Sequence, residues 1–178
     1  MNSSVTTNKI TDATSLRSAR EIAYNEFKKT QAVGKLTKQL SKLTDQLLTQ
    51  LWSKCELNNE ATLVAVGGYG RGALFPYSDI DILILLPVDS KLAESISKNV
   101  EKFITNCWDS GLEIGSSVRT VAECVSESEQ DITVRTSLLE SRYLCGQKSL
   151  FKEFAKTFEG AMDPRSFFQA KLAEQIQR

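Results

Sequence analysis

Residues 61–86 read ATLVAVGGYGRGALFPYSDIDILILL and contain two short apolar runs joined by a glycine-rich stretch. The first run, residues 61–66, ends at Gly67 and Gly68, and the second, residues 79–86, ends at a proline. Short runs rich in β-branched residues and bounded by glycine or proline are typical of buried strands. The sequence therefore predicts two core strands with a glycine-rich connection.

Two aspartates open the second predicted strand. Side chains alternate along a strand, so Asp79 and Asp81 point to one face while Ile80 and Ile82 point to the other. Two neighbouring carboxylates repel each other unless a cation lies between them. Because the ligands are oxygens only, the pair predicts Mg²⁺ or Mn²⁺. An Asp-x-Asp pair taken alone is also common as a surface feature.

The two glycines supply a second part of the same pattern. Gly67 and Gly68 have no Cβ, so the turn can bring backbone N–H groups close to phosphate oxygens. A helix beginning near Gly70 or Arg71 would add a favourable dipole, with Arg71 paired to phosphate. A Gly-Gly pair alone is usually just a turn. Together with the aspartates, which follow after ten intervening residues, it predicts a site for a metal-chelated nucleoside triphosphate.

The composition of the whole chain excludes several kinds of site. The 178 residues include 22 Lys and Arg, 22 Asp and Glu, and no His. The lack of His excludes Ser-His-Asp, Cys-His and His-metal chemistry. The zero net charge lacks the excess of positive charge that is expected of a general nucleic-acid-binding protein. The four Cys form no CxxC pair, and no apolar run approaches the ~20 residues that span a bilayer. We therefore expect a cytoplasmic protein that binds neither nucleic acid nor membrane.

Helical periodicity surrounds the two strands. Leu36, Leu40, Leu43, Leu47 and Leu51 form one apolar stripe, with Gly34 separating their helix from an earlier one. Trp52 and Trp108 lie on apolar stripes and are predicted core residues. We expect Gly111 to cap the helix before a third strand. The remaining predicted elements are helices at 15–32, 90–109, 120–129, 132–144, 147–158 and from Pro164 onward, and a strand at 112–118.

The pattern of strand, Gly-Gly, ten residues and Asp-x-Asp on a strand resembles the signature of the nucleotidyltransferase superfamily that includes DNA polymerase β. The longer string VGGYGRGALFPYSDIDILILL is similar to the N-terminal domain of the bacterial PII uridylyltransferase/uridylyl-removing enzyme family. LEIGSSVRTVAEC, DITVRTSLLESRYLCG and FFQAKLAEQIQR also resemble that family, so the similarity covers about residues 60–178. Two departures are Ala73, where we expect an acidic residue, and Ser116, where we expect His.

The resemblance implies an α+β (α/β two-layer) fold with a small mixed sheet flanked by helices. It implies an N-terminal helical arm at 1–58, a nucleotidyltransferase core at 59–160 and a C-terminal helix at 161–178. The implied activity is transfer of UMP from UTP to a tyrosine of the PII signalling protein. Pyrophosphate is released, and two divalent metal ions assist the reaction. Its uridylyl-removing and glutamine-sensing functions belong to other domains, so we expect this chain to be a fragment without them.

The resemblance also implies site residues. Superfamily members add a third carboxylate from a neighbouring strand, and Glu113 is the candidate beside Asp79 and Asp81; the alternative is that Glu113 faces solvent. Ser117 and Arg119 share its strand face. The expected nucleotide-binding residues are Gly67, Gly68, Arg71 and Ser78, although Ser78 and Tyr77 could only cap or pack the turn.

Two other functions remain open at this point. The chain could be a nucleotidyltransferase with a different acceptor, or a non-catalytic module that binds Mg-nucleotide and regulates. The intact Asp79 and Asp81 pair argues against the second of these, because loss of one carboxylate is the simplest route from enzyme to binder.

Overall fold

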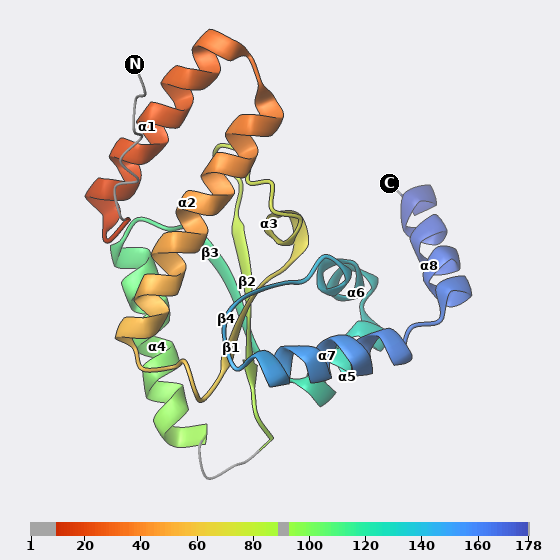
Figure 1. Cartoon of the computed structure of the whole chain (residues 1–178). Coiled ribbons are helices and arrows are strands. Elements are labelled where there is room, and N and C mark those ends of the chain that lie inside the picture. Colours follow the sequence, from red (N-terminus) through yellow and green to blue (C-terminus); the bar gives the residue numbers. More distant parts are fainter. Residues whose placement is uncertain (1–9, 89–92, 178) are drawn as a thin grey trace.

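Four strands form the central sheet in the computed structural model, which describes residues 10–88 and 93–177 (Figure 1). Their order is β3-β2-β1-β4, with β2 and β3 parallel and the other two pairings antiparallel. The sheet is therefore mixed, which confirms the predicted α+β class. The strands are β1 (Thr62–Ala65), β2 (Ile80–Leu86), β3 (Ile114–Thr120) and β4 (Arg142–Gly146).

Helices cover both faces of this sheet (Figure 1). α1, α2 and α4 lie on one face and α5, α6 and α7 on the other, so the predicted two-layer description is too simple. α8 leads away from the sheet and contacts α6. None of the helices in the described ranges is long and apolar enough to cross a membrane. The helices are α1 (Ala13–Thr30), α2 (Val33–Lys54), α3 (Gly67–Gly70), α4 (Ala93–Asp109), α5 (Val121–Gln130), α6 (Ile132–Leu139), α7 (Lys148–Gly160) and α8 (Pro164–Gln177).

The alternation of side chains along β2 divides the core into two clusters. Ile82 and Ile84 pack with residues of α1, α2 and α4. Leu83 and Leu85 point the other way and pack with residues of α5, α6 and α7. Asp81 has the parity of Leu83, so its side chain lies on the α5–α7 face.

The N-terminal helices belong to the same core as the sheet. Five leucines of α2 are buried together with Ile82 and Ile84 of β2. The division at residues 58/59 and 160/161 stays a prediction, but the first of these boundaries crosses a shared apolar core. The five leucines are Leu36, Leu40, Leu47, Leu48 and Leu51.

Two predicted features of the helices were wrong. Gly34 lies inside α2, and the break before it falls at Gln31, which adopts a left-handed conformation with φ of 55° and caps α1. The helix predicted over 132–144 ends at Leu139, and Arg142–Gly146 forms β4 instead. Pairing with β1 buries Cys145 on the sheet, and this tertiary contact outweighs the local helical pattern.

Two predicted helix ends are confirmed. The Gly111 N–H donates to the carbonyl of Trp108 at 2.8 Å, closing the end of α4 before β3. At the start of α8, the Asp163 side chain accepts a hydrogen bond from the Arg165 N–H at 3.1 Å, with Pro164 in the first helical position.

All four cysteines are buried and reduced, as predicted. Burial raises the pKa of Cys107, Cys124 and Cys145 to about 12. At pH 8 we expect these thiols to react with iodoacetamide roughly a thousandfold more slowly than an ordinary cysteine, because the thiolate is the reactive form. Mass spectrometry of timed labelling, with the urea-unfolded chain as control, measures this; equal rates in both states would contradict it.

Candidate active site

The glycine turn begins directly after β1. Gly67 has φ of +57°, a conformation that favours glycine, and opens the single helical turn α3. The helical turn therefore begins at Gly67, before the position near Gly70 or Arg71 that was considered from the sequence. The Val66 N–H donates to the Asp81 carbonyl at 3.1 Å, which joins the turn to β2.

The Asp81 carboxylate lies between two glycines. A Cβ atom added at Gly67 would lie 3.3 Å from Asp81 Oδ2. Gly115 is the partner of Asp81 in the parallel register of β2 and β3, and a Cβ atom there would lie 2.7 Å from Oδ1. The two glycines therefore leave the space that this carboxylate fills.

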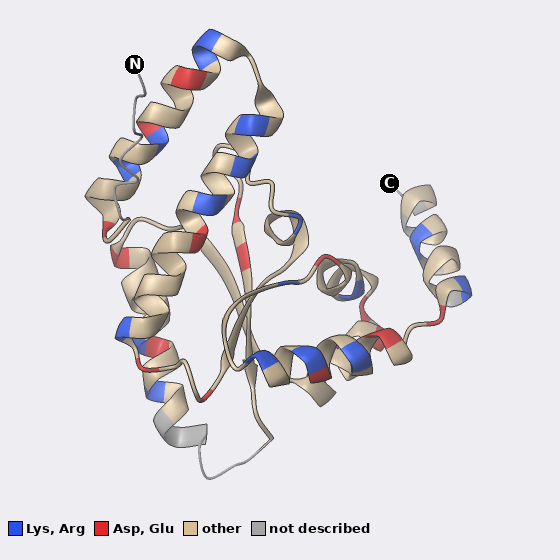
Figure 2. Cartoon of the chain, viewed as in Figure 1, with Lys and Arg blue, Asp and Glu red and all other residues tan. Residues whose placement is uncertain are grey.

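The acidic pair lies at the start of β2, where Figure 2 shows red segments, and α3 contacts this strand. Burial raises the pKa of Asp81, and the neighbouring Asp79 carboxylate raises it further. Within the described ranges, neither Asp79 nor Asp81 has a side-chain hydrogen bond or ion pair. Two unpaired carboxylates with oxygen ligands alone fit a hard divalent cation such as Mg²⁺.

Glu113 lies near Asp79 and Asp81 but does not form a three-carboxylate cluster with them. Its carbonyl accepts a hydrogen bond from the Ile80 N–H at 3.1 Å. Its side chain is exposed and lines a hollow of about 560 Å³ with Asp79, Asp81 and Trp108. In the part of the chain that the structure describes, no three acidic or thiol side chains are close enough to hold one ion. The role of Glu113 as third ligand stays a prediction.

A second hollow, of about 530 Å³, also borders Asp81. It shares Asp81 and Gly115 with the first hollow and also includes Gly67 of the glycine turn. Sequence reasoning missed the contribution of α6, whose hydroxyls at positions 133, 136 and 137 follow helical spacing on one face. The polar residues that line this hollow are Ser116, Ser117, Arg119, Asp131, Thr133, Thr136, Ser137 and Glu140.

Several predicted nucleotide contacts have partners within the protein. Arg71 donates two hydrogen bonds to the Glu140 carboxylate, at 2.7 and 2.8 Å. The Ser78 hydroxyl donates to the Phe75 carbonyl at 2.9 Å, which caps the turn before β2. Arg119 forms an ion pair with Glu127 at 2.5 Å. The roles of Arg71, Ser78, Gly67 and Gly68 toward nucleotide stay predictions.

The two tryptophans have different surroundings. Trp52 is fully buried and packs edge-to-face on Phe103 with ring centroids 5.1 Å apart, which confirms it as core. Trp108 is 59% exposed, so the core prediction for it was wrong. It follows Cys107, the last buried residue of α4, and reaches the end of the sheet where the hollow opens.

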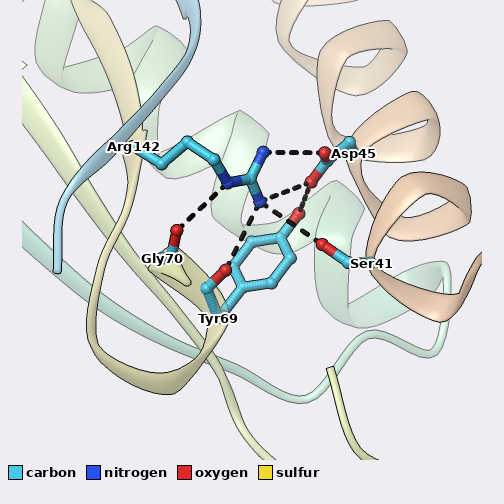
Figure 3. A network of polar contacts seen from close by, with 5 residues as sticks. All are labelled: Ser41, Asp45, Tyr69, Gly70 and Arg142. Carbon is cyan, nitrogen blue, oxygen red and sulfur yellow. Dashed lines mark hydrogen bonds and ion pairs between the residues drawn. The ribbon is translucent and has the colours of Figure 1, made fainter. Parts of the chain in front are cut away.

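A polar network fastens the glycine turn to α2 and β4 (Figure 3). Asp45 accepts a hydrogen bond from the Tyr69 hydroxyl. It also accepts two from the Arg142 guanidinium, at 2.8 and 3.1 Å. Arg142 also donates to the Gly70 carbonyl at 3.2 Å and lies 5.3 Å from the centroid of the Tyr69 ring. Burial and the Asp45 carboxylate raise the pKa of Tyr69 far above its usual range, so it remains a neutral donor.

We expect Asp45→Ala to lower the free energy of unfolding by about 2–4 kcal/mol, because Tyr69 and Arg142 would lose their shared acceptor. Urea unfolding of Asp45→Ala, Arg142→Ala and the double variant gives the coupling energy. Asp12→Ala, at the exposed N-cap of α1, is the matched control and should cost about 1 kcal/mol. Additive effects of Asp45→Ala and Arg142→Ala would contradict the network.

Gly115→Ala tests the position of Asp81. The added methyl would displace the end of the Asp81 side chain, so we expect transfer activity to fall about tenfold to a hundredfold with the fold retained. Activity and circular dichroism of the purified variant check both points. Gly160→Ala has no atom within 4 Å of the added methyl and serves as control. Full activity of Gly115→Ala would contradict the expected crowding.

Comparisons with known proteins agree with this geometry. A family model described as "Nucleotidyltransferase domain" matches residues 46–133. A protein of Cupriavidus metallidurans named "Bifunctional uridylyltransferase/uridylyl-removing enzyme" is 50% identical over 92% of this chain and 19% of its own length. Proteins with that name from Burkholderia orbicola and Burkholderia pseudomallei are 49% and 50% identical over 91% and 85% of this chain, and 19% and 18% of their own lengths. The chain thus spans about a fifth of the length of these relatives.

One solved structure also aligns with the chain. It is titled "Crystal structure of the toxin-antitoxin with AMP-PNP", with 16% identity over 73% of this chain and 90% of that chain. Its TM-score is 0.32.

Proposed function

Because the chain belongs to the nucleotidyltransferase domain family, we propose that it transfers UMP from UTP to a tyrosine hydroxyl of the PII signalling protein, releasing pyrophosphate. The observation that supports the proposal is that the Asp81 carboxylate lies directly beside Gly67 of the glycine turn. The names of the relatives with about 50% identity support uridylyl as the transferred group.

The chain's own residues have distinct parts in this proposal. Asp79 and Asp81, with Glu113 as the candidate third ligand, would hold Mg²⁺ or Mn²⁺. When bound, such an ion stabilises the negative charge that develops on the phosphates during in-line displacement. Gly67 allows phosphate oxygens to approach the backbone, and the hydroxyls of Ser117 and Ser137 face the same hollow as donors. We place this reaction in the cytoplasm, on a protein acceptor.

The test is incubation of the chain with UTP, Mg²⁺ and PII, followed by mass spectrometry of PII. Addition of one UMP to a tyrosine supports the proposal. Parallel reactions with ATP, CTP and GTP test the base, and addition of another nucleotide in preference to UMP would contradict the uridylyl assignment. Tight UTP binding without pyrophosphate release, with PII or with a panel of other acceptors, would instead support a regulatory binding module.

A further inference from the structure

The surface around Asp81 divides into two sides of different chemistry. The hollow on the Gly67 side is lined by several hydroxyls and by Arg119, whose guanidinium also pairs with Glu127. Its other two carboxylates already have partners, because Asp131 caps α6 and Glu140 holds Arg71. This side offers donors to an anionic ligand.

The hollow on the Trp108 side is acidic and aromatic. Among the described residues, its lining contains Asp79, Asp81 and Glu113 but no Lys or Arg. Two more aromatic residues, Phe75 and Tyr77, lie beyond Glu113, which lines both this hollow and the smaller one next to it. Both are exposed, as is Trp108. Apart from an ion held by these carboxylates, this side offers a triphosphate no cationic side chain, whereas a neutral or basic polypeptide segment would find an apolar rim.

We infer that the hollow beside Trp108 receives the acceptor polypeptide, with Trp108 as a contact residue, while the nucleotide binds on the Gly67 side. This inference rests on the proposed function, because it assigns the two substrates of that reaction to the two sides of Asp81. Exposed tryptophans that become covered on binding are among the strongest contacts in protein interfaces. Trp108 is therefore an acceptor-binding residue, and its ring does not stack on the base.

The two tryptophans of this chain make the nucleotide side directly measurable. Trp52 is fully buried, so acrylamide quenching of fluorescence reports on Trp108. The probe is a UTP analogue with nitrogen bridging the α and β phosphates, added with Mg²⁺. We expect unchanged quenching on saturation and a dissociation constant for Trp108→Ala within about twofold of wild type. Shielding of Trp108 by the analogue, or a tenfold loss of its affinity in Trp108→Ala, would overturn the inference.

The acceptor side is tested by steady-state kinetics of the same chain. We expect Trp108→Ala to raise the KM for PII about tenfold without changing the KM for UTP, and Trp108→Phe to recover most of the loss. Phe168→Ala, an equally exposed aromatic on α8, is the matched control and should leave both constants unchanged. An unchanged KM for PII in Trp108→Ala would overturn the inference.

The two proposals fail in different ways. Wild-type chain that binds the UTP analogue but neither binds nor modifies PII would contradict the proposed acceptor. The quenching experiment then still decides the placement of the nucleotide: an unshielded Trp108 supports it and a shielded one contradicts it.

Discussion

Asp81→Asn is expected to lower nucleotidyl transfer at least about a thousandfold while leaving the metal-free chain as stable as wild type, or more stable. The loss of activity follows because Asp81 is the carboxylate that the structure places between the glycine turn and β3. An amide of the same size keeps the shape of the site but loses the negative charge that, in the proposed function, would hold a divalent ion.

The stability effect of Asp81→Asn follows from the direction of the pKa shift. Burial and Asp79 raise the pKa of Asp81 in the folded chain, so its ionisation opposes folding. Stability is greatest while this group is protonated in both states and falls as the pH rises through its folded pKa. A neutral amide removes that penalty at neutral pH, and the expected gain is about 1 kcal/mol or less because the group is partly solvated.

Urea unfolding with and without Mg²⁺, beside the transfer assay, measures both effects. Mg²⁺ should raise the unfolding midpoint of wild type and not that of Asp81→Asn. Asp109→Asn makes the same chemical change at an exposed position outside both hollows, so its activity should be unchanged. Retained transfer in Asp81→Asn, or a stabilising effect of Mg²⁺ on that variant, would contradict the assignment.

Gly70→Ala is expected to prevent stable folding, with a loss of more than about 4 kcal/mol. A Cβ atom at Gly70 would lie 1.7 Å from the Glu140 carbonyl oxygen and 3.1 Å from that of Ala65. Both are backbone atoms, so neither can rotate away. The glycine turn would have to separate from the end of α6 or from β1, and the Arg142 hydrogen bond to the Gly70 carbonyl would be strained.

The matched control is Gly34→Ala in α2, where no atom lies within 4 Å of the added methyl. It should stabilise the chain by about 0.5–1 kcal/mol, because alanine favours helix more than glycine does. Circular dichroism and urea unfolding of the two variants compare the same substitution in opposite surroundings. A cooperative transition of Gly70→Ala near that of wild type would contradict the close contact.

The sequence predicted those parts of the fold that depend on local pattern. The apolar runs before Gly67 and after Asp79 predicted β1 and β2, and side-chain parity placed Ser117 and Arg119 on one face of β3, where both line the same hollow. Glu113 precedes this strand. The prediction placed residues 142–144 of β4 in a helix, because this strand is specified by its pairing with β1, about 80 residues earlier in the chain. No local signal reports such a pairing.

The parts of the site that come from distant segments were also hidden. Asp45 appears in the sequence as one polar residue on a helix, and only the folded chain brings it to Tyr69 and Arg142. Trp108 fits the apolar stripe of α4, and the sequence does not show that this stripe ends one residue earlier, at Cys107. The paired state of Arg71 likewise depends on Glu140, which comes from another helix.

The strand order has a consequence for synthesis on the ribosome. β1, β2 and β3 lie within residues 62–120, so most of the sheet can assemble while later segments are still being made. β4 completes the other side of β1, and Arg142 arrives with it. The polar network around the glycine turn therefore cannot be complete until β4 has been made, which is after synthesis of the strand that carries Asp81.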